Sequence, residues 1–270
     1  MPAPRPAPTP LRVTIDGRAV ALAAAGSLAI GALAQDLEFA VLAGGVALLG
    51  FAGYVTAERA WPTRALAALP GGLLIVAAPL VDVDQWWARL VVIMLLAAAA
   101  VALPDLARRW AGTGAIGLLL AAGAVGVYAC VPETAHLEYL VPAFLVLGLS
   151  EAVVRRPFGP GVALAACGLL CWAVLFGGTT RDGAIVGGLA CLGLLLLEPV
   201  ARRLPGGASA LVGGGAVSGV VAITVLQGGY CLAVSRTAGL RTDAWVALAI
   251  VAVAAIGLLV ITRAVLGGLR

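Results

Sequence analysis

The sequence predicts an all-α integral membrane protein in which about ten transmembrane helices form one bundle with short loops. Of its 270 residues, 62% are hydrophobic and 11% are charged, and the mean hydropathy is +1.09. A soluble domain carries about 25% charged residues, so a chain this apolar must be solvated largely by lipid. Its apolar runs have the length of membrane helices, and its arginines gather between alternate runs. A backbone surrounded by lipid must satisfy its own hydrogen bonds, which favours helices in these runs.

The chain divides into a short tail and one membrane domain. Residues 1–18 begin with five prolines in ten residues, which predicts a Pro-rich cytoplasmic tail and not a signal peptide. Residues 19–270 are expected to form a single polytopic domain. A spanning helix needs about 20 apolar residues, and splitting the chain at its charges gives ten such runs: 19–35, 39–57, 65–81, 88–104, 111–131, 137–154, 160–179, 183–201, 207–227 and 244–263.

Thirteen arginines fall on one side of the predicted membrane and four on the other. The larger set precedes the first predicted helix or follows the second, fourth, sixth, eighth and tenth. The smaller set consists of Arg89, Arg181, Arg236 and Arg241. Short cytoplasmic loops carry the excess of basic residues in membrane proteins. We therefore expect both termini in the cytoplasm and the plasma (inner) membrane of a bacterium as the location.

Arginine pairs recur with a spacing of 47 residues in the strings DLARRW, EAVVRRP and EPVARRLP. The spacing has two interpretations. One is a tandem helical-hairpin repeat, and the other is that any two short helices with two tight turns occupy about this length of chain. Acids three or four residues before an arginine on a helix lie on the same face as that arginine. We therefore expect ion pairs at the cytoplasmic edge from the acid of each string: Asp105, Glu151 and Glu198.

The cysteines do not form a metal-binding pattern. No Cys-x-x-Cys pair occurs, and the single histidine of the chain cannot complete a Cys/His zinc set. Cys167 and Cys171 are four residues apart on one face of a predicted helix, which favours apolar packing. Cys130 and Cys231 are predicted near the same membrane face, so a disulfide between them is the alternative to two free thiols.

Small residues are concentrated in the segments 112–126, 183–193 and 211–219. These segments contain small residues spaced four apart, such as Ala122 with Gly126, and such pairs let helix backbones approach closely in lipid. One interpretation is packing between helices of the same chain. The other is a homodimer seam or a moving interface.

The only histidine lies in the stretch CVPETAHLEYLVP, the predicted outer turn between the fifth and sixth helices. Glu133 and His136 have the Glu-x-x-His spacing of carboxylate-bridged metal sites, but the chain has no second histidine. Acid–base use of His136 with Glu133 or Glu138 is chemically feasible. The alternative is a capped turn, because acids are favoured at the positive N-terminal end of a helix.

The stretch QGGYC, residues 227–231, interrupts the ninth predicted helix. Its glutamine and two glycines predict that the helix ends or unwinds there. Residues 227–243 would then form the longest outer connection, either a loop or a re-entrant segment, and loosened helices of this kind line substrate cavities in transporters. The candidate substrate-binding residues at the outer face are Glu133, His136, Glu138, Gln227, Tyr230 and Arg236.

Two functional classes follow from these patterns. The first is a permease or exporter for a small or amphipathic molecule, and the second is a non-catalytic membrane scaffold or assembly partner of an envelope or lipid-pathway complex.

The chain has no Walker A, Gly-x-Ser-x-Gly or His-Glu-x-x-His motif. We expect no catalytic residue, metal or cofactor, although a lipid-modifying enzyme using His136 is a third interpretation. The expected partners are the lipid bilayer and either a second copy of the chain or another membrane protein, but not nucleic acid.

Overall fold

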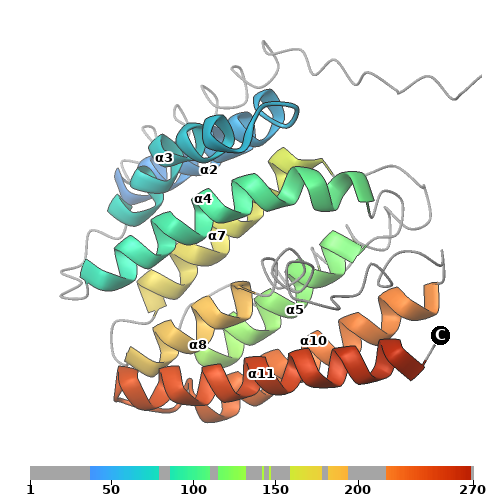
Figure 1. Ribbon diagram of the computed structural model, residues 1–270. Helices are drawn as coiled ribbons and strands as arrows, with labels where there is room; N and C mark the ends of the chain where they lie inside the picture. The colour runs from blue at the N-terminus through green and yellow to red at the C-terminus, as the bar shows by residue number, and fades with distance from the viewer. Residues whose placement is uncertain are drawn as a thin grey trace, which may run out of the picture.

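The computed structural model describes residues 37–78, 86–109, 115–131, 159–177, 182–193 and 217–268, together with Pro142 and Val146. Within these residues the chain is all-helical, with eight helices and no strand, as the composition predicts (Figure 1). The helices are α2 (Leu37–Val55), α3 (Trp61–Ala77), α4 (Trp86–Arg109), α5 (Ala115–Cys130), α7 (Pro160–Gly177), α8 (Asp182–Leu192), α10 (Val217–Thr237) and α11 (Ala244–Gly268).

Each described helix corresponds to one of the predicted helices, with boundaries shifted by up to about ten residues. The predicted helix at 19–35 lies outside the described residues, and so does the one at 137–154 apart from the helical positions 142 and 146. Two described stretches, Trp86–Arg108 and Ala244–Ile261, are long and apolar enough to cross a membrane.

The described helices lie roughly side by side in successive layers. α2 and α3 lie on one side, followed by α4 and α7, then by α5 and α8, with α10 and α11 on the other side (Figure 1). Several pairs in contact are distant in the sequence: α2 packs on α7, and α5 packs on α10. The layers therefore depend on long-range contacts that no local pattern encodes.

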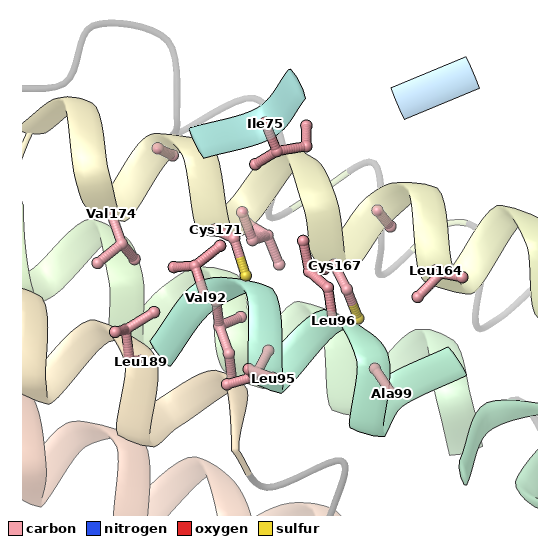
Figure 2. Packing of buried hydrophobic residues seen from close by; sticks show 14 of the residues in the cluster. Ile75, Val92, Leu95, Leu96, Ala99, Leu164, Cys167, Cys171, Val174 and Leu189 are labelled. Atoms are coloured by element: carbon pink, nitrogen blue, oxygen red, sulfur yellow. The ribbon is translucent and has the colours of Figure 1, made fainter. Parts of the chain in front are cut away.

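The larger apolar cluster is centred on α4 and α7. Figure 2 shows Cys167 and Cys171 of α7 among Ile75 of α3 and Val92 and Leu96 of α4. Both thiols are fully buried. The prediction that this pair packs as two small apolar residues is confirmed, in keeping with the usual behaviour of buried free cysteine.

Glycines bring α2 and α7 into close contact. A Cβ atom added to Gly161 would overlap the Tyr54 ring and the carbonyl oxygen of Gly50. One added to Gly53 would lie 2.7 Å from the Cα atom of Gly161. Because the backbones themselves touch, van der Waals packing at this seam requires glycine on both helices.

A second, smaller apolar cluster joins α5, α8, α10 and α11. It includes Ala122, Val186, Cys231 and Val234, and the half-buried Trp87 of α4 packs against both clusters. α11 lies at the edge of this cluster, and only 11% of its stretch Ala244–Ile261 is buried. Most of that apolar helix therefore faces outward.

Arg64, Asp105 and Arg108 form an ion-pair cluster between the start of α3 and the end of α4, called here the Arg64 end of the bundle. Arg108 Nη2 donates to Asp105 Oδ1 at 2.7 Å, and Arg64 Nη1 lies 3.4 Å from the same oxygen. The Arg64 side chain is 9% exposed, whereas Asp105 is 51% exposed. The predicted pairing of Asp105 with Arg108 is confirmed, and Arg64 joins it. The equivalent acids of the other two strings lie outside the described residues: Glu151 and Glu198.

The turn between α10 and α11 meets the start of α8 at the opposite end of the bundle, called here the Arg241 end. The Gly183 N–H donates to the Arg241 carbonyl oxygen at 3.1 Å. Asp243 Oδ1 accepts a hydrogen bond of 2.8 Å from the Trp245 N–H, which caps the start of α11. The two ends therefore hold separate groups of charged residues.

The prediction that the ninth helix ends or unwinds at residues 227–231 is wrong. α10 runs without interruption from Val217 to Thr237, so residues 227–237 form neither a loop nor a re-entrant segment. The connection to α11 is confined to residues 238–243. Glycine costs a helix only about 1 kcal/mol relative to alanine, and the contacts of α10 with α5, α8 and α11 stabilise the helix through Gly228 and Gly229.

We predict that Asp105→Ala destabilises the protein by about 1–2 kcal/mol, because the buried Arg64 charge loses its counter-ion while keeping its hydrogen bond to the Val101 carbonyl. Thermal unfolding in detergent micelles measures the effect. The 58% exposed Arg108 is the matched control, and Arg108→Gln should change stability by less than about 0.5 kcal/mol.

A second substitution distinguishes lost charge compensation from lost packing. Adding Arg64→Met to Asp105→Ala removes the uncompensated charge, so the double variant should be more stable than Asp105→Ala alone. Equal stability of the single and double variants would contradict the ion-pair explanation.

Candidate functional site

The structure describes three of the six candidate site residues, and all three lie on α10. Gln227 and Tyr230 are buried, at 5% and 8% exposure, and Arg236 is exposed. Nine residues separate Gln227 from Arg236, which places them on opposite faces of a helix with 3.6 residues per turn. The structure therefore does not bring Arg236 into a site with Gln227. The candidates of the 130–142 stretch lie outside the described residues: Glu133, His136 and Glu138.

One face of α10 is buried along half of the helix. Gln227 is followed at helical spacing by Tyr230, Cys231, Val234 and Ala238, all of them buried. Residues three or four apart share a helix face, so these side chains form one stripe. α10 packs along α5 and α8, and we call the region between these three helices the α5–α8–α10 junction.

Gln227 brings a polar group into this apolar junction. Its Oε1 atom is buried and has no hydrogen-bond partner among the residues that the structure describes. A buried acceptor without a donor costs about 1–3 kcal/mol, and such a group calls for an explanation in ligand, ion or water binding. The position is also central: α10 runs for ten residues, ~15 Å, on either side of it.

Glu38 Oε1, Arg64 Nε and Arg89 Nε are also buried without a partner among the described residues, but each lies within four residues of the start of its helix. Other buried hydroxyl groups bond within one turn. Thr56 Oγ1 donates to the Ala52 carbonyl at 2.6 Å, and Ser235 Oγ donates to the Leu232 carbonyl at 3.0 Å. Trp172 Nε1 also lacks a partner within the described residues, but its ring is only half-buried and stacks on Phe176 with centroids 5.1 Å apart. Gln227 is buried more deeply and has no comparable contact.

Three cysteines from different helices meet in the junction, and one of them, Cys231, lies one turn after Gln227 on α10. The Cys191 thiol of α8 lies near the thiols of Cys130 of α5 and Cys231 of α10. Its Sγ atom also lies 3.8 Å from the Cys231 carbonyl oxygen, toward which it donates. All three thiols are free, so the predicted alternative of a Cys130–Cys231 disulfide is not what the structure contains. We call this group the thiol cluster.

Glycines make room for the sulfur atoms. A Cβ atom added to Gly126 would lie 2.5 Å from Cys191 Sγ, and one added to Gly187 or Gly239 would lie 3.0 Å from Cys130 Sγ. The small residues of α5 and α8 are therefore used in packing within the chain. The intrachain packing that the sequence offered as one interpretation is therefore present at these glycines.

The chemistry available at the junction is hydrogen bonding in apolar surroundings. Cβ atoms added to Gly228 or Gly229 would meet nothing within 4 Å among the described residues, but Gly229 lies on the face of α10 that carries the exposed Arg236 and not on the Gln227 stripe. No group of three Cys, His, Asp or Glu side chains among the described residues is placed to hold a metal ion. The junction can therefore recognise a molecule through the Gln227 amide and the Tyr230 phenol.

The sequence predicted Gln227 and Tyr230 as site residues for an incorrect reason, the supposed break in the helix. It assigned no role in a site to Cys130, Cys191 or Cys231. The spacing of Cys231 from Gln227, four residues, does place both on one face. The approach of Cys130 and Cys191 from other helices has no sequence signal.

We predict that Gly126→Ala destabilises the protein by about 1–3 kcal/mol, because the added methyl group must displace Cys191 in a tightly packed core. The matched control is Gly257→Ala in α11, where a Cβ atom meets nothing within 4 Å. That substitution should stabilise the helix by about 0.5–1 kcal/mol. Thermal unfolding in detergent measures both changes.

The origin of the effect can be checked at Cys191. Adding Cys191→Ala to Gly126→Ala removes the sulfur atom that the methyl group would meet, and should restore part of the lost stability. Wild-type stability of Gly126→Ala would contradict the close approach of α5 and α8.

No protein-family model, curated protein or solved structure matches this chain. Its residues and contacts are therefore the basis for a functional inference. Among the described residues, Gln227 and the side chains around it form the candidate site.

Proposed function

We propose that the protein is a multi-pass permease or exporter of the bacterial inner membrane, with about ten spanning helices and both termini in the cytoplasm. Its cargo is a small or amphipathic molecule that binds at the α5–α8–α10 junction. The observation that carries the proposal is the buried, unpartnered acceptor of Gln227 at the middle of α10. A polar group at mid-depth of an apolar bundle is costly and typical of functional positions.

The distribution of charge supports membrane insertion. Every Asp, Glu and Arg of the described helices lies within five residues of the first or last residue of its helix. The stretches between are apolar, and α11 exposes a series of large side chains that includes Val253, Ile256 and Val260. Exposed apolar surface of this extent would be solvated by hydrocarbon, while the charged ends reach water.

The two ends of the bundle support the predicted orientation. Arg59 lies with Arg64 and Arg108 at the Arg64 end, and the sequence pattern predicts a cytoplasmic position for all three. Arg236 and Arg241 lie at the opposite end, where the pattern predicts the outer face. The three-dimensional grouping thus agrees with the alternation of arginines that underlies the orientation.

We predict that a cysteine at position 241 reacts with a membrane-impermeant maleimide in intact cells, whereas one at position 59 reacts only after permeabilisation. Arg241 and Arg59 are both exposed, so Arg241→Cys and Arg59→Cys are matched in accessibility. The five native cysteines are buried and serve as the unlabelled background. The reverse pattern would overturn the orientation, and labelling of both positions in intact cells would overturn the separation of the ends by a membrane.

Transport itself is tested with purified protein in liposomes. Solute entry is followed by light scattering after mixing with glycerol, acetamide, choline or lactate, and is compared with protein-free liposomes. We expect at least one solute to enter faster through the protein. Gln227→Leu should reduce that entry about tenfold or more, because it removes the amide from the junction, whereas Arg236→Gln on the opposite face of α10 should leave it unchanged.

The permease proposal is wrong if none of these solutes enters faster than in protein-free liposomes and cells lacking the protein accumulate amphipathic dyes normally. The scaffold alternative would then be favoured. The packing of Gly126, Gly183 and Gly187 within the chain argues against it at present, because those small-residue faces are not free to contact a partner.

A further inference from the structure

We infer that the junction beside Gln227 takes an uncharged molecule that carries a hydrogen-bond donor and an apolar body. This inference deepens the proposed function by naming the chemical class of the cargo, and it rests on binding at the same site. It follows from three features of the described residues: an acceptor without a donor, the absence of charge in the junction, and the apolar surface around it.

The acceptor sets the first requirement. Gln227 is 5% exposed, and its buried Oε1 atom has no hydrogen-bond partner in the described part of the chain. A bound O–H or N–H group would supply the missing hydrogen bond and remove the cost of the unsatisfied oxygen. A molecule with acceptors alone would leave that oxygen unsatisfied and add a second desolvated acceptor.

The nearby polar groups of the described residues do not supply that donor. The Cys191 thiol donates toward the Cys231 carbonyl oxygen. Ser235 donates to the carbonyl oxygen of Leu232 in its own helix. The Tyr230 phenol lies three residues from Gln227 on the same stripe, where it provides a second polar group for a bound molecule.

Charge sets the second requirement. The described helices of the junction carry charge only at the Arg241 end, where α8 begins with Asp182 and α10 ends with Arg236. Asp182 lies nine residues before Cys191, and Arg236 faces away from Gln227. An ion placed beside Gln227 would therefore lose its water without gaining a counter-charge, which is far more costly than burying a neutral group.

The surroundings set the third requirement. Leu226 packs against the smaller apolar cluster, and the stripe continues with Cys231 and Val234. Apolar pockets with one or two placed polar groups are typical of sites for small amphipathic ligands, so the body of the molecule is apolar and its donor is directed at the amide.

The test uses four small amphipathic probes that differ in hydrogen-bond donors and in charge. 1,2-Octanediol has two O–H donors, and its isomer 1,2-dimethoxyhexane has the same atoms but no donor. Octanoate and octyltrimethylammonium supply the two signs of charge. Each probe is added to the full-length protein in detergent, and the shift in unfolding temperature is measured for wild type and for Gln227→Leu. The difference between the two proteins cancels effects of the probe on the micelle.

We expect 1,2-octanediol to raise the unfolding temperature of the wild type, since a ligand that binds only the folded state stabilises it. With the dimethoxy isomer or with either ion, the unfolding temperature of the wild type should shift no more than that of Gln227→Leu does. Gln227→Leu should bind the diol at least tenfold more weakly, because the amide that accepts the hydrogen bond is gone. Without probe, it should unfold at or above the wild-type temperature, because an unsatisfied acceptor has been removed. Arg236→Gln, altered on the opposite face of α10, should respond as the wild type does.

Equal shifts with the diol and its isomer, or an undiminished diol shift in Gln227→Leu, would overturn the inference. A clear loss of stability in Gln227→Leu without probe would also overturn it, because the amide would then have a structural partner. Failure of the proposed function gives a different result: the diol binds with the expected selectivity, yet no solute enters liposomes. Solute entry that favours choline or lactate would refute the inference and leave the permease intact.

Discussion

The close approach of helix backbones at glycine is the constraint on which the arrangement depends. At Gly161 against Tyr54 and at Gly126 against Cys191, an added methyl group would overlap the neighbouring helix. In lipid the hydrophobic effect does not hold apolar helices together, so association depends on packing and on the few polar contacts available. The seam of α2 with α7 fixes one side of the bundle, and that of α5 with α8 and α10 fixes the other. Because the second seam also surrounds Gln227, the geometry of the candidate site is a consequence of the same packing.

The features that the sequence predicted well are local or depend on composition. The helical class follows from apolar runs, and the pairing of Asp105 with Arg108 follows from a three-residue spacing on one helix. The pair Cys167 and Cys171 follows equally from periodicity. The participation of Arg64 in the ion pair does not follow from any local pattern, because it depends on how α3 lies against α4. A pattern within one helix identifies which residues share a face, but not which other helix that face contacts.

The stretch at 227–231 shows why the candidate site was predicted in the wrong conformation. Two adjacent glycines are weak helix formers, and in water that local preference would favour an end or a loop. Inside a bundle, an unpaired backbone group costs more than the conformational preference of glycine. Continuing α10 to Thr237 keeps the backbone bonded and places Gln227 and Tyr230 on the buried stripe. The meeting of Cys130, Cys191 and Cys231 could not be predicted, since it brings together three helices that are far apart in the chain.

The remaining question is why the chain retains a glutamine where a leucine would pack without cost. The hydroxyl groups of Thr56, Ser235 and Thr237 donate to backbone carbonyl oxygens within one turn. A glutamine side chain is longer, and in α10 its carbonyl oxygen is left without a donor among the described groups. Stability alone would favour an apolar residue at this position. On the proposed function, the polar group in the middle of this apolar helix is satisfied by the bound molecule for part of the working cycle, which gives a reason to retain a residue that stability alone disfavours.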